Sequence, residues 1–590
     1  MSQAAQEMRR KAARCVFLRD LDAPSALEGL ARTPPSVAGH GLEGHRQETS
    51  DPSASRSSTT PDRHTSSFLA LTSQQNGPRT ELSKSQPTVV AQQMSPPDGS
   101  LQLQDAAWLA CSPDTLPLEQ WTADFASTRW LDLLASDAAQ ADSGFSLAPS
   151  PAQEDNDGGP RHRRATASVH ASPALLNGQA QLPENLDPEF ERIAWQSAGD
   201  VVLSDHEAVL FRHFADRCAP WLDVLDPQKL FSTYAIRLAL RNMGLMKAVL
   251  ALSAKHRSKS IKVHAPESQD VNDPRDCGGD GECVGYYYET LHYVREALTY
   301  PSYSHSEELL ATALVISAYE MLDESDGSGN WQRHLKGIFW IQRSQDVDGA
   351  CGGLRQAVWW AWIRQDIWAA FREKRPCLSF WSPVKNFHEL DQHELADWAI
   401  YLLSQAVNYS AYARDAEATS SLDPLASMQL KGRRDDLLSR LERWKACLGD
   451  EYKTLPTPTG PSDVFTPLWV HPPQFGVALQ AYSFAQILIA LHSPNSTGFN
   501  GYLKLQKTLS EAVNTICGIA MELKDESCQI MSAQYLYGAG LCVQDQEKQD
   551  KIISMISSCE ERVGWAPMAT WRDDLRQEWA RADKDPERRI

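Results

Sequence analysis

The sequence contains no uninterrupted apolar run of about 18 residues, so it predicts no transmembrane helix. Its N-terminal segment is basic but has no apolar stretch of the length that a secretory signal requires. Its 12 cysteines form no dense, regular framework, which argues against the disulfide-rich secreted class. These absences together favour a reducing compartment, either the cytosol or the nucleus.

Signatures of catalysis are also missing. The chain has no GxSxG nucleophile elbow, no Walker loop and no dinucleotide fingerprint. In HELDQHEL, His388 and His393 are five residues apart and would diverge by about 140° on an α-helix. The zincin motif needs two histidines at positions i and i+4, which this stretch lacks. We therefore expect an exposed acidic helix there. We predict no catalytic residue, no cofactor and no metal ligand.

Two histidines stand out in the aromatic-rich stretch 210–258, because His213 and His256 lie among large apolar residues. We interpret each of them as a core or boundary residue, since a lone histidine in such a position is more often structural than a ligand. The tryptophans clustered at 359–368 are likewise interpreted as core, in preference to a ligand-binding aromatic pocket. Arg364 and Asp366, beside them, are expected to form a structural ion pair.

Aromatic residues are scarce before residue 190. Between residues 31 and 100 Phe68 is the only one, and Ser, Thr, Pro, Gln and Gly predominate. Such a composition cannot bury enough apolar surface to offset the entropy of ordering. We therefore predict that residues 1–190 are largely disordered, with a polar linker at 148–190.

One segment, 105–147, interrupts this polar region. It carries seven acidic residues and a single arginine, interleaved with Trp121, Phe125, Trp130, Leu131 and other bulky apolar side chains. Acidic residues spaced between large apolar ones keep these side chains in water until a partner offers a groove. The pattern is typical of a transcriptional activation segment. The alternative is a helix that docks onto the main domain, and the sequence does not choose between the two.

The charge balance is acidic, with a formal net charge of −19. This works against general binding to nucleic acid, whose affinity comes largely from neutralisation of phosphates by Lys and Arg. A short basic cluster, Arg161, Arg163 and Arg164, has the composition of a nuclear import signal. The alternative is a solvated charged tail.

Helical periodicity dominates from residue 191 to residue 590, and strand-like alternation is scarce. Breaks rich in Gly, Pro or Asp separate the helical segments at 264–285, 323–330, 346–353 and 454–463. The expected fold is all-α: a large multi-helix domain over 191–590, preceded by a long disordered N-terminal region.

The order of these helical segments resembles the fungal-specific transcription factor domain, the helical regulatory region of fungal zinc-cluster transcription factors. The resemblance begins with LFRHFADRCAPWLDVLDPQKLFSTYAIRLALRNMGLMKAVLALSAKHRS and extends over about 195–580. It continues in order through YYYETLHYVREAL, LLATALVISAYEML, NWQRHLKG, IRQDIWAAFREKRP, PLWVHPPQFGVALQAYSFAQILIALHSP and VGWAPMATWRDDLRQEW. Their order and spacing together carry the resemblance.

The chain departs from that family at its N-terminal end. Family members usually carry a six-cysteine binuclear zinc cluster that reads DNA, but only Cys15 and Cys111 precede residue 190 here. Either the DNA-binding cluster is naturally absent or it lies upstream of this sequence. We therefore expect DNA contact only through a partner, unless such a cluster precedes Met1.

The resemblance implies a nuclear, non-enzymatic transcriptional regulator of a metabolic or secondary-metabolite biosynthesis gene set. Its expected partners are the transcription machinery or a co-activator, and a second zinc-cluster factor in a homo- or heterodimer, with no membrane. One alternative is an interaction protein without DNA binding that titrates a paralogous factor. Another is an enzyme with an unrecognised pocket in the helical domain.

Overall fold

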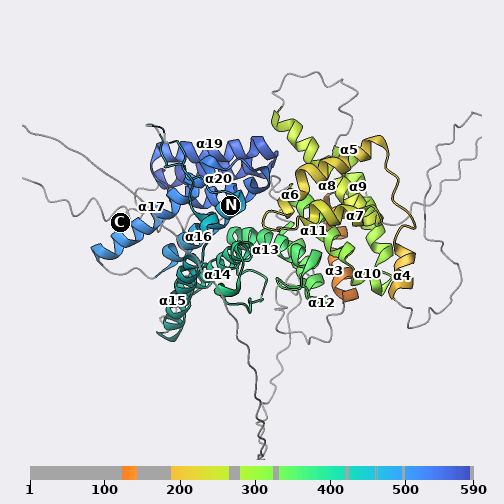
Figure 1. Ribbon diagram of the computed structural model, residues 1–590, viewed down its shortest axis with the longest axis horizontal. Helices are drawn as coiled ribbons and strands as arrows, with labels where there is room; N and C mark the ends of the chain where they lie inside the picture. Colours follow the sequence, from red (N-terminus) through yellow and green to blue (C-terminus); the bar gives the residue numbers. More distant parts are fainter. Residues whose placement is uncertain are drawn as a thin grey trace, which may run out of the picture. The chain divides into compact units, whose positions relative to one another are not determined.

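The computed structural model describes residues 123–141, 188–264, 280–322, 331–379, 381–418, 424–458, 460, 463–493 and 498–584 (Figure 1). Over these residues the all-α expectation is confirmed: they contain helices, and their only β-pairing is one isolated bridge between Leu455 and Trp469. Of residues 1–190, for which disorder was predicted, the structure describes 123–141 and 188–190, and the others lie outside this description.

The helical elements follow one another closely along the chain. The first group comprises α3 (Ala123–Ala141), α4 (Pro188–Trp195), α5 (Asp205–His213), the π-helix η2 (Phe214–Cys218), α6 (Ala219–Leu222), the π-helix η3 (Phe231–Ala235), α7 (Ile236–Ala239), α8 (Met243–His264), α9 (Asp280–Ala297), α10 (Pro301–Ser304), α11 (Glu307–Met321), α12 (Trp331–Ser344) and α13 (Gly353–Glu373). The second comprises η5 (Phe387–Glu389), α14 (Gln392–Ala418), α15 (Pro424–Ala446), η6 (Asp450–Tyr452), α16 (Pro473–His492), α17 (Phe499–Glu522), η7 (Glu526–Cys528), α18 (Gln529–Gly540), α19 (Gln546–Val563) and α20 (Pro567–Lys584).

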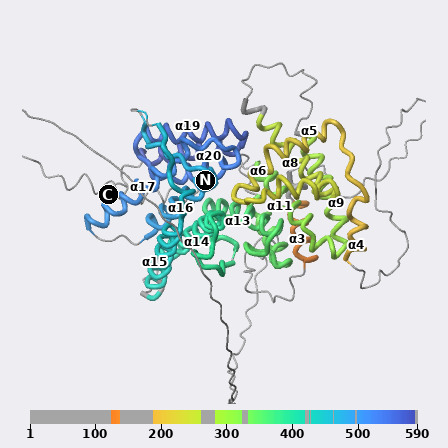
Figure 2. Tube along the Cα trace, viewed as in Figure 1, coloured from red at the N-terminus to blue at the C-terminus, as the bar shows by residue number. Residues whose placement is uncertain are grey.

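Helix α13, the last of the first group, lies between the helices that precede it and those that follow it, as the colours of the chain trace make visible in Figure 2. It packs against α11 and α12 on one side and against α14 on the other. Its tryptophans make the contacts: Trp362 donates its indole N–H to the carbonyl of Leu335 in α12, and Trp368 meets Trp571 of α20 edge to face, with ring centroids 4.9 Å apart. The prediction that these tryptophans are core residues agrees with their burial.

Helix α11 is apolar on all sides, and it is correspondingly buried along almost its whole length. Its start is set by Ser306, whose hydroxyl accepts a hydrogen bond from the backbone N–H of Leu309 (3.1 Å). Helix α5 also begins at a serine N-cap, where Ser204 and Glu207 form a reciprocal capping box. Ordinary capping chemistry therefore sets where these helices begin.

Asp366 and Arg364, the expected ion pair, take different partners. Asp366 is fully buried, accepts a hydrogen bond from the backbone N–H of Leu378 (2.6 Å), and pairs with Arg375 (2.8 Å). Arg364 instead donates to the backbone carbonyl of Leu222 (2.7 Å). The prediction was wrong because residues two apart on a helix point in different directions.

Helix α3 is the part of the acidic–aromatic segment that the structure describes. It packs against α12, α9 and α10. Trp130 and Leu134 are fully buried, whereas Phe125 is 41% exposed. Gly337 of α12 allows this close approach, because a Cβ there would come within 2.5 Å of the Trp130 ring. The docked arrangement is thus the one that the chain adopts here.

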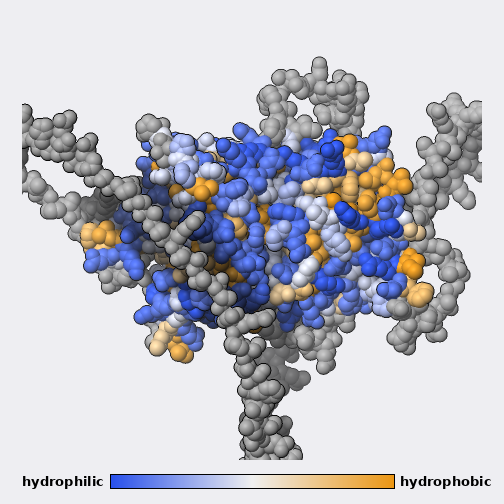
Figure 3. Space-filling model, viewed as in Figure 1, coloured by the Kyte–Doolittle hydropathy of each residue, from blue (hydrophilic) through white to orange (hydrophobic). Residues whose placement is uncertain are grey.

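Helix α16 is long and apolar enough to cross a membrane by length and composition, although the sequence contains no unbroken apolar run of that length. Most of it is buried between α14, α17 and α18, as expected for the central helix of a bundle. The face of the molecule in Figure 3 is largely hydrophilic, with apolar patches over the N-terminal helices and at the ends of α15 and α17. Leu425 and Met428 are exposed in α15, and Phe499 and Leu503 in α17.

We predict that Trp130→Ala releases α3 from the domain. Truncating a fully buried tryptophan costs about 3–5 kcal/mol of packing free energy. We expect this loss to exceed the free energy that holds α3 on the domain, because the helix is bound by one face. Hydrogen exchange of the α3 amides should become much faster, while that of α11 is unchanged. Phe125→Ala in the same helix is the matched control and should leave exchange as it is. Equal protection of α3 in both variants would contradict this account of how the helix is held.

Candidate functional site

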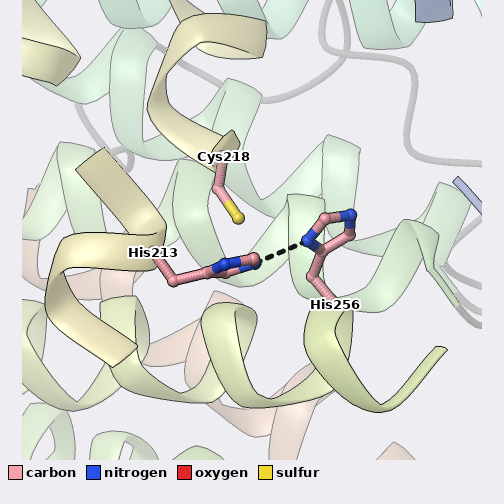
Figure 4. A group of neighbouring side chains, drawn as sticks. All are labelled: His213, Cys218 and His256. Carbon is pink, nitrogen blue, oxygen red and sulfur yellow. Dashed lines mark hydrogen bonds between the residues drawn. The ribbon is translucent and has the colours of Figure 1, made fainter. Parts of the chain in front are cut away.

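The described structure brings three side chains with nitrogen and sulfur donors together: His213, Cys218 and His256. Their ligand atoms all lie within 4.8 Å of one another. His213 is the last residue of α5, Cys218 the last of η2, and His256 belongs to α8. Figure 4 shows the Cys218 thiol pointing into the space between the two imidazole rings. The sequence predicted each histidine as an isolated core residue and did not single out Cys218.

The π-helical turn explains why residues five apart meet. On a regular α-helix, side chains at i and i+5 diverge by about 140°. The wider i→i+5 turn of a π-helix returns the chain to nearly the same face after five residues, and such turns are frequent at functional sites. His213 precedes η2 and Cys218 ends it, so this turn lies between the two donors.

A hydrogen-bond chain defines the protonation of both imidazoles. His256 Nε2 lies 2.6 Å from the carbonyl oxygen of Val563, which can only accept, so Nε2 carries the proton. Nδ1 of His256 is therefore the unprotonated nitrogen, and it accepts from His213 Nε2 at 2.8 Å. The Nδ1 electron pair of His256 thus faces the cluster.

Burial decides the charge state of the cluster. It lowers the pKa of His256 to about 4 and, together with the positive charges of His256, Arg257 and Arg217, that of His213 to about 3. Burial also raises the pKa of the Cys218 thiol. All three groups are consequently neutral near pH 7.

The surroundings of the cluster are aromatic on one side and tied to the C-terminal helices on the other. Trp221 meets His256 edge-on at 4.8 Å between ring centroids, and Trp565 meets Trp221 at 5.2 Å. Arg217 of η2 pairs with Glu526 (2.7 Å) and donates to the carbonyl of Arg562 (2.7 Å). The cluster therefore joins α5, η2 and α8 to the end of α19.

His213 and His256 were singled out from the sequence as core residues; the other residues singled out there lie elsewhere. Trp130 and Leu131 are buried in the contact between α3 and the domain, and Phe125 is exposed on the same helix. Trp121 and the basic cluster Arg161, Arg163 and Arg164 lie outside the described residues. HELDQHEL was expected to form one exposed helix, and this prediction was wrong: His388 is in η5 and His393 in α14.

Comparison with known proteins agrees with the resemblance seen in the sequence. Residues 209–341, which run from α5 to α12, match the family model described as the fungal specific transcription factor domain. The chain is also similar to a curated protein, the transcription activator AMTR1 of Alternaria alternata, with 20% identity over 349 residues. That alignment covers 48% of this chain and 45% of the relative, so the chain spans less than half of the relative's length. No solved structure matches significantly.

We predict that Gly564→Ala destabilises the domain more than a glycine replacement of equal backbone strain. Gly564 ends α19 with φ +64°, and a Cβ there would collide with Ser260 Oγ and lie 3.1 Å from His256 Nε2. Gly353→Ala is the control, because Gly353 has φ +59° and open space around its Cβ position. The backbone strain alone costs about 1–2 kcal/mol in each variant.

Denaturant unfolding of both variants measures the difference in the free energy of unfolding. In Gly564→Ala the free energy of unfolding should fall by the cost of the backbone strain. It should fall further by the contribution of the displaced His256–Val563 hydrogen bond, about 1 kcal/mol or more. Equal midpoints for the two variants would show that the close approach of the α19 end to His256 contributes nothing.

Proposed function

We propose that this chain, whose residues 209–341 match the fungal specific transcription factor domain, is a nuclear transcriptional regulator of the fungal zinc-cluster family. The observation that carries the proposal is this domain match, and the similarity to a transcription activator supports it. Its targets on this view are genes of a metabolic or secondary-metabolite pathway. The chain acts on them without catalysis of its own.

The activating element in this proposal is the segment 105–147, of which α3 is the described part. Asp124 and Asp132 lie exposed on α3, while Trp130 and Leu131 face the domain. An acidic surface around a compact apolar stripe is the arrangement by which an amphipathic helix fills a co-activator's groove. The apolar stripe cannot pack against the helical domain and fill a co-activator's groove at the same time. The helical domain therefore masks the segment until α3 is released.

The remaining assignments follow from the same proposal. Arg161, Arg163 and Arg164 supply the nuclear import signal. The transcription machinery or a co-activator binds the released segment, and DNA is reached through a dimer with a zinc-cluster factor or through a zinc cluster upstream of this sequence. The second candidate, an interaction protein that titrates such a factor, shares the helical domain but needs no activating segment.

An enzymatic role has less support from the described cavities. Two of them, next to Arg364, have volumes of about 10 and about 60 Å³. Ligand pockets in proteins commonly enclose about 300–1,000 Å³. The larger cavity is lined mainly by apolar side chains such as Met321, Ile530 and Trp565.

A reporter assay tests the activating segment. Residues 105–147 fused to an unrelated DNA-binding module should activate transcription, and Trp130→Ala with Leu131→Ala should abolish the signal because the apolar stripe is lost. Fused residues 105–590 should be weaker, since the stripe is buried there. A silent wild-type segment would favour the interaction protein over the activator.

Gly337→Ala in the longer fusion tests the masking directly. Its Cβ overlaps Trp130, so we expect α3 to be displaced and the reporter signal to rise toward that of the isolated segment. Gly285→Ala is the matched control, a helical glycine with no atom within 4 Å of its Cβ position. A signal that is unchanged in Gly337→Ala while the isolated segment is active would contradict masking by α3.

A further inference from the structure

The cluster of His213, Cys218 and His256 has the donor geometry of a metal site. Ions bound at about 2.0–2.1 Å from nitrogen and about 2.3 Å from sulfur hold donors about 3.3–3.8 Å apart in tetrahedral or trigonal sites. The two imidazole nitrogens here are 2.8 Å apart, and all three donor atoms lie within 4.8 Å. Small side-chain adjustments therefore suffice to surround one ion. The donors come from α5, η2 and α8, which packing already holds together.

The neighbour of His256 is the one that a metal-bound imidazole requires. Metal-ligating histidines almost always donate their other ring N–H to a carboxylate, a backbone carbonyl or water, which orients the ring. His256 donates Nε2–H to Val563 and directs its Nδ1 electron pair toward the cluster. The second-shell partner that orients a metal-bound imidazole is therefore supplied by the backbone of α19.

We propose that His213 Nε2, Cys218 Sγ and His256 Nδ1 bind a single thiophilic d¹⁰ cation, Cu⁺ or Zn²⁺. On binding, the thiol proton leaves to solvent and a metal–sulfur bond replaces it. His213 moves its ring proton from Nε2 to Nδ1, so that Nε2 becomes a ligand. No oxidant or reductant takes part in this exchange.

Thiolate and imidazole together select soft and borderline ions over Mg²⁺ or Ca²⁺. Charge separates the two candidates. One thiolate neutralises Cu⁺ completely but leaves a unit charge with Zn²⁺, and the positive charge of Arg257 also acts on this cluster. A residual positive charge in a buried site is unfavourable. The surroundings therefore favour Cu⁺, and three ligands without water match the burial of Cys218 and His256.

The site would couple metal to the architecture of the domain. His256 reaches Val563, the last residue of α19, and Arg217 reaches Arg562 beside it. An ion held between η2 and α8 therefore stiffens the contact between the N-terminal helices and the end of α19. This inference stands on the cluster alone and goes beyond the transcriptional role proposed above.

The test is metal binding by the full-length chain, stripped of metal and kept reduced, with Cu⁺ and Zn²⁺ titrated separately against a competing chelator. We expect one ion per chain, a higher melting temperature when the ion is bound, and X-ray absorption showing one sulfur and two nitrogen neighbours. Cys218→Ser and His213→Gln should each weaken binding by about 100-fold or more, because removing a ligand costs more than disturbing the second shell.

Two controls make the result specific. Cys447→Ser removes a second thiol–imidazole pair, whose Sγ lies 3.6 Å from His388 Nδ1 at the surface, and it should retain binding. Circular dichroism of the metal-free variants shows whether each is folded. His213 is only half-buried, so His213→Gln keeps the test valid if Cys218→Ser unfolds. The proposal is overturned if neither ion binds, or if the bound ion survives both site variants or disappears in Cys447→Ser.

Discussion

The burial of α13 is the constraint on which the rest of the described fold depends. This helix carries a dense group of tryptophans and must cover them on all sides, because each buries a large apolar surface. Trp362 is covered by α12, where it also stacks on Phe339, and Trp368 is covered by α18 and α20. Helices before and after α13 in the sequence are thereby held on opposite sides of one element.

The buried carboxylate of α13 has two partners. Asp366 lies inside α13 with no exposure, and it is matched by Arg375 and the backbone of Leu378 just beyond the helix end. The chain must therefore turn back sharply after α13, because both partners lie within twelve residues of Asp366. A buried carboxylate without them would cost several kcal/mol. The need to pair Asp366 therefore favours one geometry of the turn after α13.

Helix α3 and the His213–Cys218–His256 cluster lie against different helices of the N-terminal part. Helix α3 covers α12 by a single apolar stripe, whereas the His213–Cys218–His256 cluster sits where η2 and α8 approach the end of α19. Both depend on close backbone approach at a glycine: Gly337 beneath Trp130, and Gly564 beside His256. Side chains larger than hydrogen at these positions would separate the elements, so the chain's smallest residue determines where distant segments meet.

The sequence by itself determined the helical class, breaks between helices such as that at 346–353, and the burial of the tryptophans, because periodicity and clusters of Gly, Pro or Asp act over a few residues. It also identified the acidic–aromatic composition around α3 but left its packing open, since the same stripe suits a co-activator or α12. The same spacing has two different outcomes in this chain. His388 and His393 are five apart and lie in separate elements, whereas His213 and Cys218 are also five apart and come together through a π-helical turn. Only the tertiary structure decided this, because the extra residue in that turn and the approach of His256, 43 positions from His213, arise from packing between segments distant along the chain.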